Sequence, residues 1–460
     1  MNTNITVAPI GNNTPATHPD GCITERPTIL ILAYSDLSKD PRVSRQIGWL
    51  SHDYHVIAAG TAPPNNKDIT FLNFGRIHSR KLGLFGVFRS AITRIPFARS
   101  AYRTLKGTAI ELKKFACKVY GNTFNTTGGS AREQQTQSQS DKHIEYFKNK
   151  LDFLTNYSVL EGLKPDLIIA NDLDCLVLAD SIFNGVKILF DAHEYAPLEY
   201  EEGDEWLNFE KPARIYFCEE LLPKVVRMTT VCQGIADEYM RQFVVRHPIE
   251  VITNAPHYEN ITPGRTSGRI RIIHHGIGAP IRKIELMAEA VKLLDDRFEL
   301  YLMLVAGAPE YIKQLELRYA KEPRIHFINP VPMLEIAKFT SQFDIGLFLL
   351  EPTVFNYKYA LPNKFFEFIQ ARLAIAIGPS PEMERIVKQY DLGVVAADFS
   401  PEAMANALRN ISIADIDRFR SNSHQAAAQF CAEANKEIML NIVRSALSDT
   451  GLPVPVNNLG

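Results

Sequence analysis

The sequence has few cysteines, and they are scattered along the chain. The six are Cys22, Cys117, Cys175, Cys218, Cys232 and Cys431. No two of them form a CxxC arrangement, which argues against a zinc site and against a disulfide framework. Scattered cysteines of this kind are typical of buried thiols in a reducing compartment.

Long apolar runs and a strong net charge are also missing. No stretch approaches the roughly 18 apolar residues of a transmembrane helix. Residues 1–26 are polar and lack the basic and apolar regions of a signal peptide. We therefore expect a disordered leader over 1–26 and a cytoplasmic protein. The formal net charge is -2, from 50 basic and 52 acidic residues, so no overall field would attract nucleic acid.

The 460 residues, 46% hydrophobic and 22% charged, are enough for two globular domains. In the first half, short apolar runs that predict buried strands alternate with helical patterns. The expected strands cover 27–33, 55–59, 165–170, 186–190, 228–232 and 250–253. This alternation indicates βαβ units around a parallel sheet, and we place an N-terminal domain at 27–256.

The same alternation returns after a linker at about 256–268 that is rich in Pro, Gly and Thr. Here the expected strands cover 269–275, 299–306, 325–328, 344–350, 373–377 and 393–396. We place a C-terminal domain at 269–430. The last segment, 431–460, is expected to form a helix and tail that return to the N-terminal domain. The fold class is therefore α/β, with two Rossmann-like domains facing each other across a cleft.

An insertion of different character interrupts the first half at about 76–145. Its first part, 76–118, holds eleven basic residues and a single acid, Glu111, with apolar residues interleaved. Such a segment can lie on an anionic membrane surface, or it can be a solvated helical insertion that packs on the domain. The stretch 121–141 is of low complexity and predicts a mobile loop, with a helix after it at about 142–162.

Polar residues gather where strands of the N-terminal domain end. They are Asp172, Asp174, Asp191, His193 and Glu194, with Asp36, Asp40 and Arg42 after the first strand. In parallel sheets, ligands bind at this carboxyl edge. His193 is a candidate general base or hydrogen-bond donor, or else a structural histidine. The D-x-D spacing of Asp172 and Asp174 occurs in metal sites, but two acids after a strand are common, and Asp40 can simply cap a helix.

Two stretches of the C-terminal domain have the character of anion sites. In the first, a turn at 276–280 that begins with Gly276 precedes Arg282 and Lys283 at the start of a helix. In the second, Pro362 suits a helix start, which points the backbone N–H groups near Asn363 and Lys364 at a ligand. Glu367 follows within a turn and can bind a ribose. The alternative is a surface helix with an ordinary lysine and glutamate.

With these motifs in order, residues 270–397 resemble the glycosyltransferase family 4 group of GT-B enzymes, and residues 27–256 resemble it more weakly. The motifs that carry the resemblance are IIHHGIGAPIRKIELMAEA, RIHFINPVPMLEIAKFTSQFDIGLFLL, LPNKFFEFIQARLAIAIG and EMERIVKQYDLGVV, together with DPRVSRQIGWL and FDAHEY in the first half. Their order and spacing carry more weight than any single motif.

The resemblance implies roles for particular residues. Glu367 falls where the family binds the nucleotide ribose, Arg282 where a cation contacts the donor diphosphate, and His193 in the segment that faces the reacting sugar. Three positions depart from the family pattern. Tyr359 replaces a glutamate expected to help hold the donor sugar, Ile277 replaces an arginine, and Arg372 replaces a glycine.

The expectation is therefore a hexosyltransferase that moves a sugar from a nucleoside-diphosphate donor, a UDP-sugar, with retention of configuration. His193, Arg282 and Lys283 would be catalytic, and Gly276, Asn363, Lys364 and Glu367 would bind the nucleotide, with no metal and no cofactor. The acceptor would be a glycan or a lipid-linked glycan, at the inner face of a membrane if 76–118 binds there. The rivals are a non-catalytic scaffold subunit and a nucleotide-sugar 2-epimerase.

Overall fold

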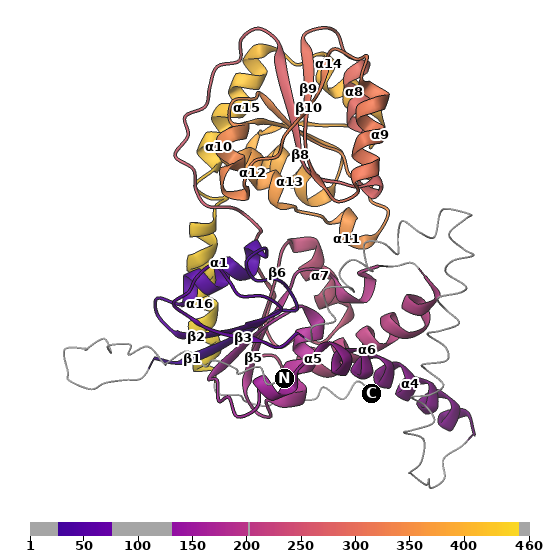
Figure 1. Ribbon diagram of the computed structural model, residues 1–460, viewed down its shortest axis with the longest axis vertical. Coiled ribbons are helices and arrows are strands. Elements are labelled where there is room, and N and C mark those ends of the chain that lie inside the picture. Colours follow the sequence, from indigo (N-terminus) through magenta and orange to yellow (C-terminus); the bar gives the residue numbers. More distant parts are fainter. Residues whose placement is uncertain (1–25, 76–130, 201–202, 450–460) are drawn as a thin grey trace, which may run out of the picture.

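The computed structural model describes residues 26–75, 131–200 and 203–449. The described chain is organised around two parallel sheets, one in each half of the sequence (Figure 1). Helices cover the sheets, and the carboxyl ends of the strands in each half face the other half. The expected α/β class with two Rossmann-like units is confirmed.

The N-terminal sheet has seven strands in the order β3-β2-β1-β4-β5-β6-β7, and every neighbouring pair is parallel. The strands are β1 (Thr28–Leu32), β2 (His55–Gly60), β3 (Thr70–Asn73), β4 (Leu167–Asn171), β5 (Lys187–Ala192), β6 (Arg227–Thr230) and β7 (Glu250–Val251). The helices of this half are α1 (Pro41–Leu50), α4 (Ala131–Leu154), α5 (Asp172–Ile182), α6 (Lys211–Leu221) and α7 (Gln233–Gln242). Strand β3 was not expected, because its short sequence TFLN is only half-buried.

The C-terminal sheet has six parallel strands in the order β10-β9-β8-β11-β12-β13. They are β8 (Ile270–Gly278), β9 (Phe298–Ala306), β10 (Ile325–Ile328), β11 (Ile345–Phe348), β12 (Ala374–Ile377) and β13 (Gly393–Val395). The helices are α8 (Glu285–Lys292), α9 (Pro309–Tyr319), α10 (Ile336–Thr340), α11 (Phe355–Lys358), α12 (Asn363–Gln370), α13 (Pro381–Tyr390), α14 (Pro401–Arg409) and α15 (Ile413–Ala426).

The last helix, α16 (Ala432–Ser448), returns to the N-terminal domain as expected. It lies beside α1 and β5 (Figure 1). Its apolar face, with Met439, Ile442 and Val443, shares one buried cluster with Ile31 of β1 and Ile47 of α1. The chain therefore crosses between the two domains twice.

Two sequence expectations about element boundaries are wrong. Strand β8 does not end before Gly276. It continues to Gly278, paired with β9 from Gly276↔Leu304 to Gly278↔Ala306, so the observed turn begins at Pro280, four residues later than predicted. Strand pairing accommodates Gly276, at φ +127°, because glycine has no Cβ. The turn is the short 3-10 helix from Pro280 to Arg282.

The low-complexity stretch also differs from its prediction. A loop was expected over 121–141, but α4 begins at Ala131 and ends at Leu154, earlier at both ends than the helix expected at 142–162. A polar helix has little apolar periodicity from which to recognise it. The basic segment 76–118 and the leader 1–26 lie outside the described residues, apart from residue 26.

Helix α12 is the element that carries the second predicted anion site. Its residues Phe365, Phe366, Phe368 and Ile369 are buried against the sheet and the neighbouring helices. Gly346 of β11 makes this packing possible, because a Cβ at that position would lie 2.4 Å from Cγ of Phe368. The approach of α12 to β11 therefore depends on the missing side chain.

We predict that Gly346→Ala lowers the unfolding free energy by about 1–3 kcal/mol, since the added methyl group forces Phe368 and α12 to shift. The measurement is the midpoint of urea unfolding. Gly48→Ala on α1 is the matched control, because nothing lies within 4 Å of its Cβ position, and it should be neutral or stabilising by about 0.5 kcal/mol. An equal midpoint for Gly346→Ala and the unmodified protein would contradict this account of the packing.

Candidate active site

The first part of the site is formed by Gly276, Lys364 and Arg282 in the C-terminal domain. Nζ of Lys364 lies 2.7 Å from where a Cβ of Gly276 would be, so only glycine leaves room for it. Nζ also lies 4.7 Å from the centre of the Phe348 ring. Burial and then the charge of Arg282 lower the pKa of Lys364 to about 7. These two basic groups, here called the cation pair, are thus held close together, and Glu367 acts in the opposite direction on the pKa of Lys364.

Helix α12 begins directly beside this lysine. Pro362 is its N-cap and Asn363 its first residue, one position later than expected, and no side chain caps the helix. The N–H groups of its first turn therefore lack a side-chain acceptor, which is the usual condition of a helix N-terminus that binds an anion.

Glu367 is buried, with 8% of its surface exposed. Its Oε2 lies 3.4 Å from Nε2 of His275, but that nitrogen has no hydrogen-bond partner in the part of the chain that the structure describes. Burial, with Lys364 second, lowers the pKa of His275 to about 3, so the imidazole is neutral. Burial raises the pKa of Glu367 to about 7, although Lys364 and Arg45 act in the opposite direction. This carboxyl group is therefore poorly solvated in the protein alone.

Arg282 and Lys283 have different surroundings. The guanidinium of Arg282 lies over the ring of Tyr357, with 5.2 Å between its Cζ and the ring centre. Its positive charge lowers the pKa of Lys364. Lys283 has a left-handed backbone at φ 44° and forms an ion pair with Glu351. The structure thus brings Arg282 to Lys364, whereas Lys283 already has an anionic partner.

The second part of the site is His193, at the carboxyl edge of the N-terminal sheet. Its Nε2 lies 3.0 Å from Oδ1 of Asn171 and 3.4 Å from Oδ2 of Asp191, and its Nδ1 lies 3.3 Å from Asp172. Burial disfavours the imidazolium, but Asp172 and Asp191 outweigh it, so the pKa of His193 is raised. A protonated His193 is a hydrogen-bond donor rather than a base.

Asp191 is fully buried and is the centre of a hydrogen-bond network. Arg42 donates to both of its oxygens, at 2.7 and 2.5 Å, and Gln46 and Thr229 donate to it as well. Burial opposes ionisation, but the charge and hydrogen bonds of Arg42 hold the pKa of Asp191 far below its usual range. Arg42 and Asp191, both expected near the cleft, thus form a buried bidentate ion pair with each other. Asp40 caps α1, accepting from the N–H groups of Arg42 and Val43.

The D-x-D pair does not converge on one point. Asp172 turns to His193, whereas Asp174 faces Lys150 at 3.9 Å and Arg214 at 3.6 Å. Within the described ranges, no three His, Cys, Asp or Glu side chains gather as metal ligands. No helix in those ranges is long and apolar enough to cross a membrane. The four cysteines that the structure describes, Cys175, Cys218, Cys232 and Cys431, are free and buried, as expected.

Helix α11 joins the two parts of the site. Asn356 accepts from the N–H of Tyr195 at 2.8 Å and donates to the carbonyl of Leu198 at 3.2 Å and to Glu194 at 3.5 Å. Tyr357, the next residue, contacts the guanidinium of Arg282. Helix α11 thus contacts both the segment that follows His193 and one member of the cation pair. Sequence reasoning missed Asn356, since nothing in its local pattern distinguishes it from a loop residue.

Tyr359, which stands where the family resemblance expects a glutamate, lies in the same contact. A Cβ at Gly234 of α7 would be 2.1 Å from Cδ1 of Tyr359, so the ring lies flat on that glycine. Its carbonyl accepts from Sγ of Cys232 at 3.3 Å. Tyr359 therefore joins the domains by packing.

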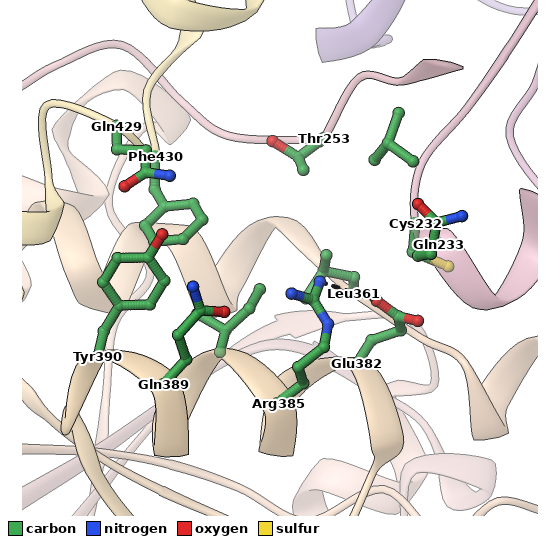
Figure 2. Close-up of a pocket in the computed structure, with 12 residues that line it drawn as sticks. Cys232, Gln233, Thr253, Leu361, Glu382, Arg385, Gln389, Tyr390, Gln429 and Phe430 are labelled. Carbon is green, nitrogen blue, oxygen red and sulfur yellow. Dashed lines mark hydrogen bonds and ion pairs between the residues drawn. The ribbon is translucent and has the colours of Figure 1, made fainter. Parts of the chain in front are cut away.

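A separate pocket of about 310 Å³ opens between the domains near the crossover to α16 (Figure 2). Arg385, Gln389 and Tyr390 rise from α13 toward Thr253 and Gln233 of the N-terminal domain. None of the residues predicted to bind the nucleotide is among the twelve that line this pocket. The cation pair and His193 thus belong to a different part of the domain boundary.

Arg45 is a further residue that sequence reasoning missed. It lies on α1, one turn after Arg42. Its positive charge favours the ionised form of Glu367 across the domain boundary and so acts to lower the pKa of that carboxyl group. The spacing of two arginines at i and i+3, directly after a loop at the carboxyl edge, was the available signal.

The pKa of Glu367 leads to a prediction about stability. Between its usual pKa, 4.5, and about 7, the folded protein keeps a proton that the unfolded chain has released. The unfolding free energy should therefore fall with rising pH in this interval, relative to Glu367→Gln, which cannot ionise. By pH 8 the variant should have gained about 1–3 kcal/mol relative to its difference at pH 4.5.

The measurement is chemical unfolding at a series of pH values, with Glu437→Gln on the exposed face of α16 as the matched control. A difference between Glu367→Gln and the unmodified protein that is constant with pH would be the contrary result.

No protein-family model matches the chain, and no curated protein is significantly similar to it in sequence. Several solved structures are similar over nearly its whole length. One is HepE from Anabaena in complex with UDP-glucose, with TM-score 0.55, 12% identity, and 91% of this chain and 100% of that chain covered.

Two further structures are similar in the same way. Sucrose-phosphate synthase from Thermosynechococcus elongatus has a TM-score of 0.57 at 13% identity and covers 91% of this chain and 98% of its own. A glycosyltransferase from Rickettsia africae has a TM-score of 0.58 at 11% identity, with 93% and 100% covered. Identities this low show the fold alone, and that fold is the two-domain GT-B architecture.

Proposed function

We propose that this protein is a family 4 type glycosyltransferase that takes its sugar from a nucleoside-diphosphate donor, a UDP-sugar. The observation that carries the proposal is the cation pair of Lys364 and Arg282 at the uncapped start of α12, with Glu367 one turn further on. A diphosphate supplies the anion that this arrangement lacks, and Glu367 can accept hydrogen bonds from ribose hydroxyls.

The chemistry breaks the bond between the anomeric carbon and the diphosphate oxygen and forms a bond from that carbon to an acceptor hydroxyl oxygen, whose proton passes to the departing diphosphate. Negative charge develops on the leaving diphosphate. Lys364, Arg282 and the N–H groups near Asn363 would stabilise this charge, which is how preorganised dipoles and cations lower such a barrier. Lys283 would contribute only after leaving Glu351. The proposal needs no metal ion, because these groups already supply positive charge.

His193 would act on the reacting sugar from the N-terminal side. Its raised pKa favours the protonated ring. Asn171 and Asp191 hold its Nε2 in place, and we assign to Nδ1 the role of donating a hydrogen bond to a sugar hydroxyl that takes the place of the half-exposed Asp172. Retention of configuration and transfer of a hexose belong to this proposal through the family resemblance.

The neighbouring structures support a nucleotide donor. HepE was solved with UDP-glucose and with UDP, a trehalose-6-phosphate protein from E. coli with UDP-2-fluoro glucose, and TarM from S. aureus with UDP and a glycerol glycoside of GlcNAc. For this chain we propose a glycan or lipid-linked glycan as the acceptor, and a cytoplasmic site of action at a membrane face.

A scaffold subunit without activity is the second candidate, and one observation favours it. Tyr359 stands in place of a glutamate expected to hold the donor sugar, and its ring is fixed against Gly234 rather than offered to a ligand. Such a subunit would bind nucleotide weakly or not at all.

We predict that UDP stabilises the folded protein against heat and that Glu367→Ala abolishes the effect. A ligand that binds only the folded state adds about 2.7 kcal/mol at 100 times its dissociation constant. The measurement is thermal unfolding with UDP, GDP, ADP or CMP at millimolar concentration, and Glu437→Ala serves as the matched control. Absence of any shift with all four nucleotides would favour the scaffold subunit.

If UDP raises the unfolding temperature, the next measurement is a turnover assay with a panel of UDP-sugars. A transferase releases UDP faster when acceptor glycans are present. Conversion of the donor to an epimer without any acceptor would instead identify the isomerase of the same fold.

We further propose that the basic segment 76–118, outside the described residues, holds the enzyme on an anionic membrane. Replacing Arg89, Arg94, Arg99 and Arg103 with Gln should strongly reduce co-sedimentation with phosphatidylserine liposomes, since each basic residue near such a surface contributes about 1 kcal/mol. The control replaces four exposed cations elsewhere, Arg241, Arg318, Lys388 and Arg418. Equal co-sedimentation of both variants would contradict membrane binding through residues 76–118.

A further inference from the structure

Two arginines lie one turn apart on α1, and only one of them is satisfied. Arg42 donates to Asp191, to the carbonyl of Ile252 at 2.6 Å and to Asn254. Arg45 has its Nε and one terminal nitrogen buried, and within the described residues neither atom has a hydrogen-bond partner. A guanidinium carries five N–H donors, and these two nitrogens carry three of them, so leaving them buried and unused is costly.

The surroundings of Arg45 call for an anion. Burial and then the charge of Arg42 lower its pKa to about 10, while Asp40 and Glu367 act in the opposite direction. The group therefore stays charged at neutral pH. Glu367, the carboxyl group opposite it in the C-terminal domain, has a pKa raised to about 7 and makes no hydrogen bond to Arg45. Glu367 alone does not neutralise this arginine.

A count of the charges around Glu367 points the same way. Three basic groups, Arg45, Arg282 and Lys364, act on one another or on Glu367, and Asp40 is a second carboxyl group that acts on Arg45. Lys283 is excluded from the count because Glu351 already neutralises it. The cations come from both domains, so the missing negative charge belongs at the boundary between them.

We propose that Arg45 is a further donor-binding residue, which reaches from the N-terminal domain to the diphosphate held by Lys364 and Arg282. The inference rests on the proposed function. A planar guanidinium matches phosphate oxygens through two parallel hydrogen bonds, which a ribose does not offer. Arg45 would thus place one cation of the N-terminal domain against a nucleotide that is otherwise bound by the C-terminal domain.

The test compares UDP with uridine on the unmodified protein, Arg45→Gln, Arg45→Lys and the control Lys39→Gln. Lys39 precedes α1, and its side chain is 81% exposed beside Asp36. Calorimetric titration measures UDP affinity, and ligand-observed NMR measures uridine affinity. Arg45→Gln should weaken UDP binding at least about 10-fold, the scale of a hydrogen bond between charged groups, and leave uridine affinity within about twofold. Arg45→Lys should recover part of the loss, and Lys39→Gln should bind as the unmodified protein does.

The thermal midpoint without ligand separates ligand binding from a merely structural role. Because two buried nitrogens of Arg45 have no hydrogen-bond partner within the described residues, Arg45→Gln should unfold at the same temperature as the unmodified protein or higher. A lower midpoint, or equal losses of UDP and uridine affinity, would overturn the proposal. UDP binding by Arg45→Gln as tight as that of the unmodified protein would overturn it and leave the proposed function standing, whereas an unmodified protein that does not bind UDP would overturn both.

Discussion

The buried ion pair of Arg42 and Asp191 fixes the cleft-facing edge of the N-terminal domain. Asp191 is the penultimate residue of β5, two residues before His193, and Arg42 lies in the first turn of α1, one turn before Arg45. The pair is bidentate, and Gln46 and Thr229 satisfy the carboxylate further. Removing one partner from such a pair typically costs 3–5 kcal/mol, because a charge is left buried and alone. One interaction thus sets the positions of both His193 and Arg45.

At the edge that faces the N-terminal domain, the ionisable groups of the C-terminal domain are buried without full pairing, in contrast to Arg42 and Asp191. Lys364, Glu367 and His275 are all shifted away from their usual pKa values by burial, and none of them gains a full partner. A fold at its stability optimum would replace or pair these groups. Clustered departures of this kind are characteristic of functional sites, where stability is given up for a ligand. The rest of that domain is regular, with an apolar core around β8 and α8.

The sequence alone was sufficient for the architecture, because buried parallel strands are near-continuous apolar runs and helices between them keep their own period. It failed where local pattern and tertiary context disagree. Helix α4 is polar in its first half, and β8 continues through two glycines because its neighbour β9 pairs with them. His193 was predictable from the rule that strand ends meet at one edge. Arg45, His275 and Asn356 were missed because they lie within or beside regular elements. The packing of one domain on the other gives Arg45 and Asn356 their surroundings, and the packing of α12 on β8 gives His275 its own.

The contact of α11 with the N-terminal domain lies close to the expected donor site, so a bound donor would affect how the two domains pack. Helix α11 is attached to the N-terminal domain through Asn356 and Tyr359, yet Asn363 of α12, the expected anion site, follows Tyr359 by only four residues. A ligand at α12 therefore binds next to the contact that holds the domains together. Because cations reach this place from both domains, an anion bound there is attracted most strongly when the domains are closed. A ligand shifts a conformational equilibrium by its difference in affinity for the two states, so a diphosphate would itself favour closure, and its departure after transfer would weaken the same contact.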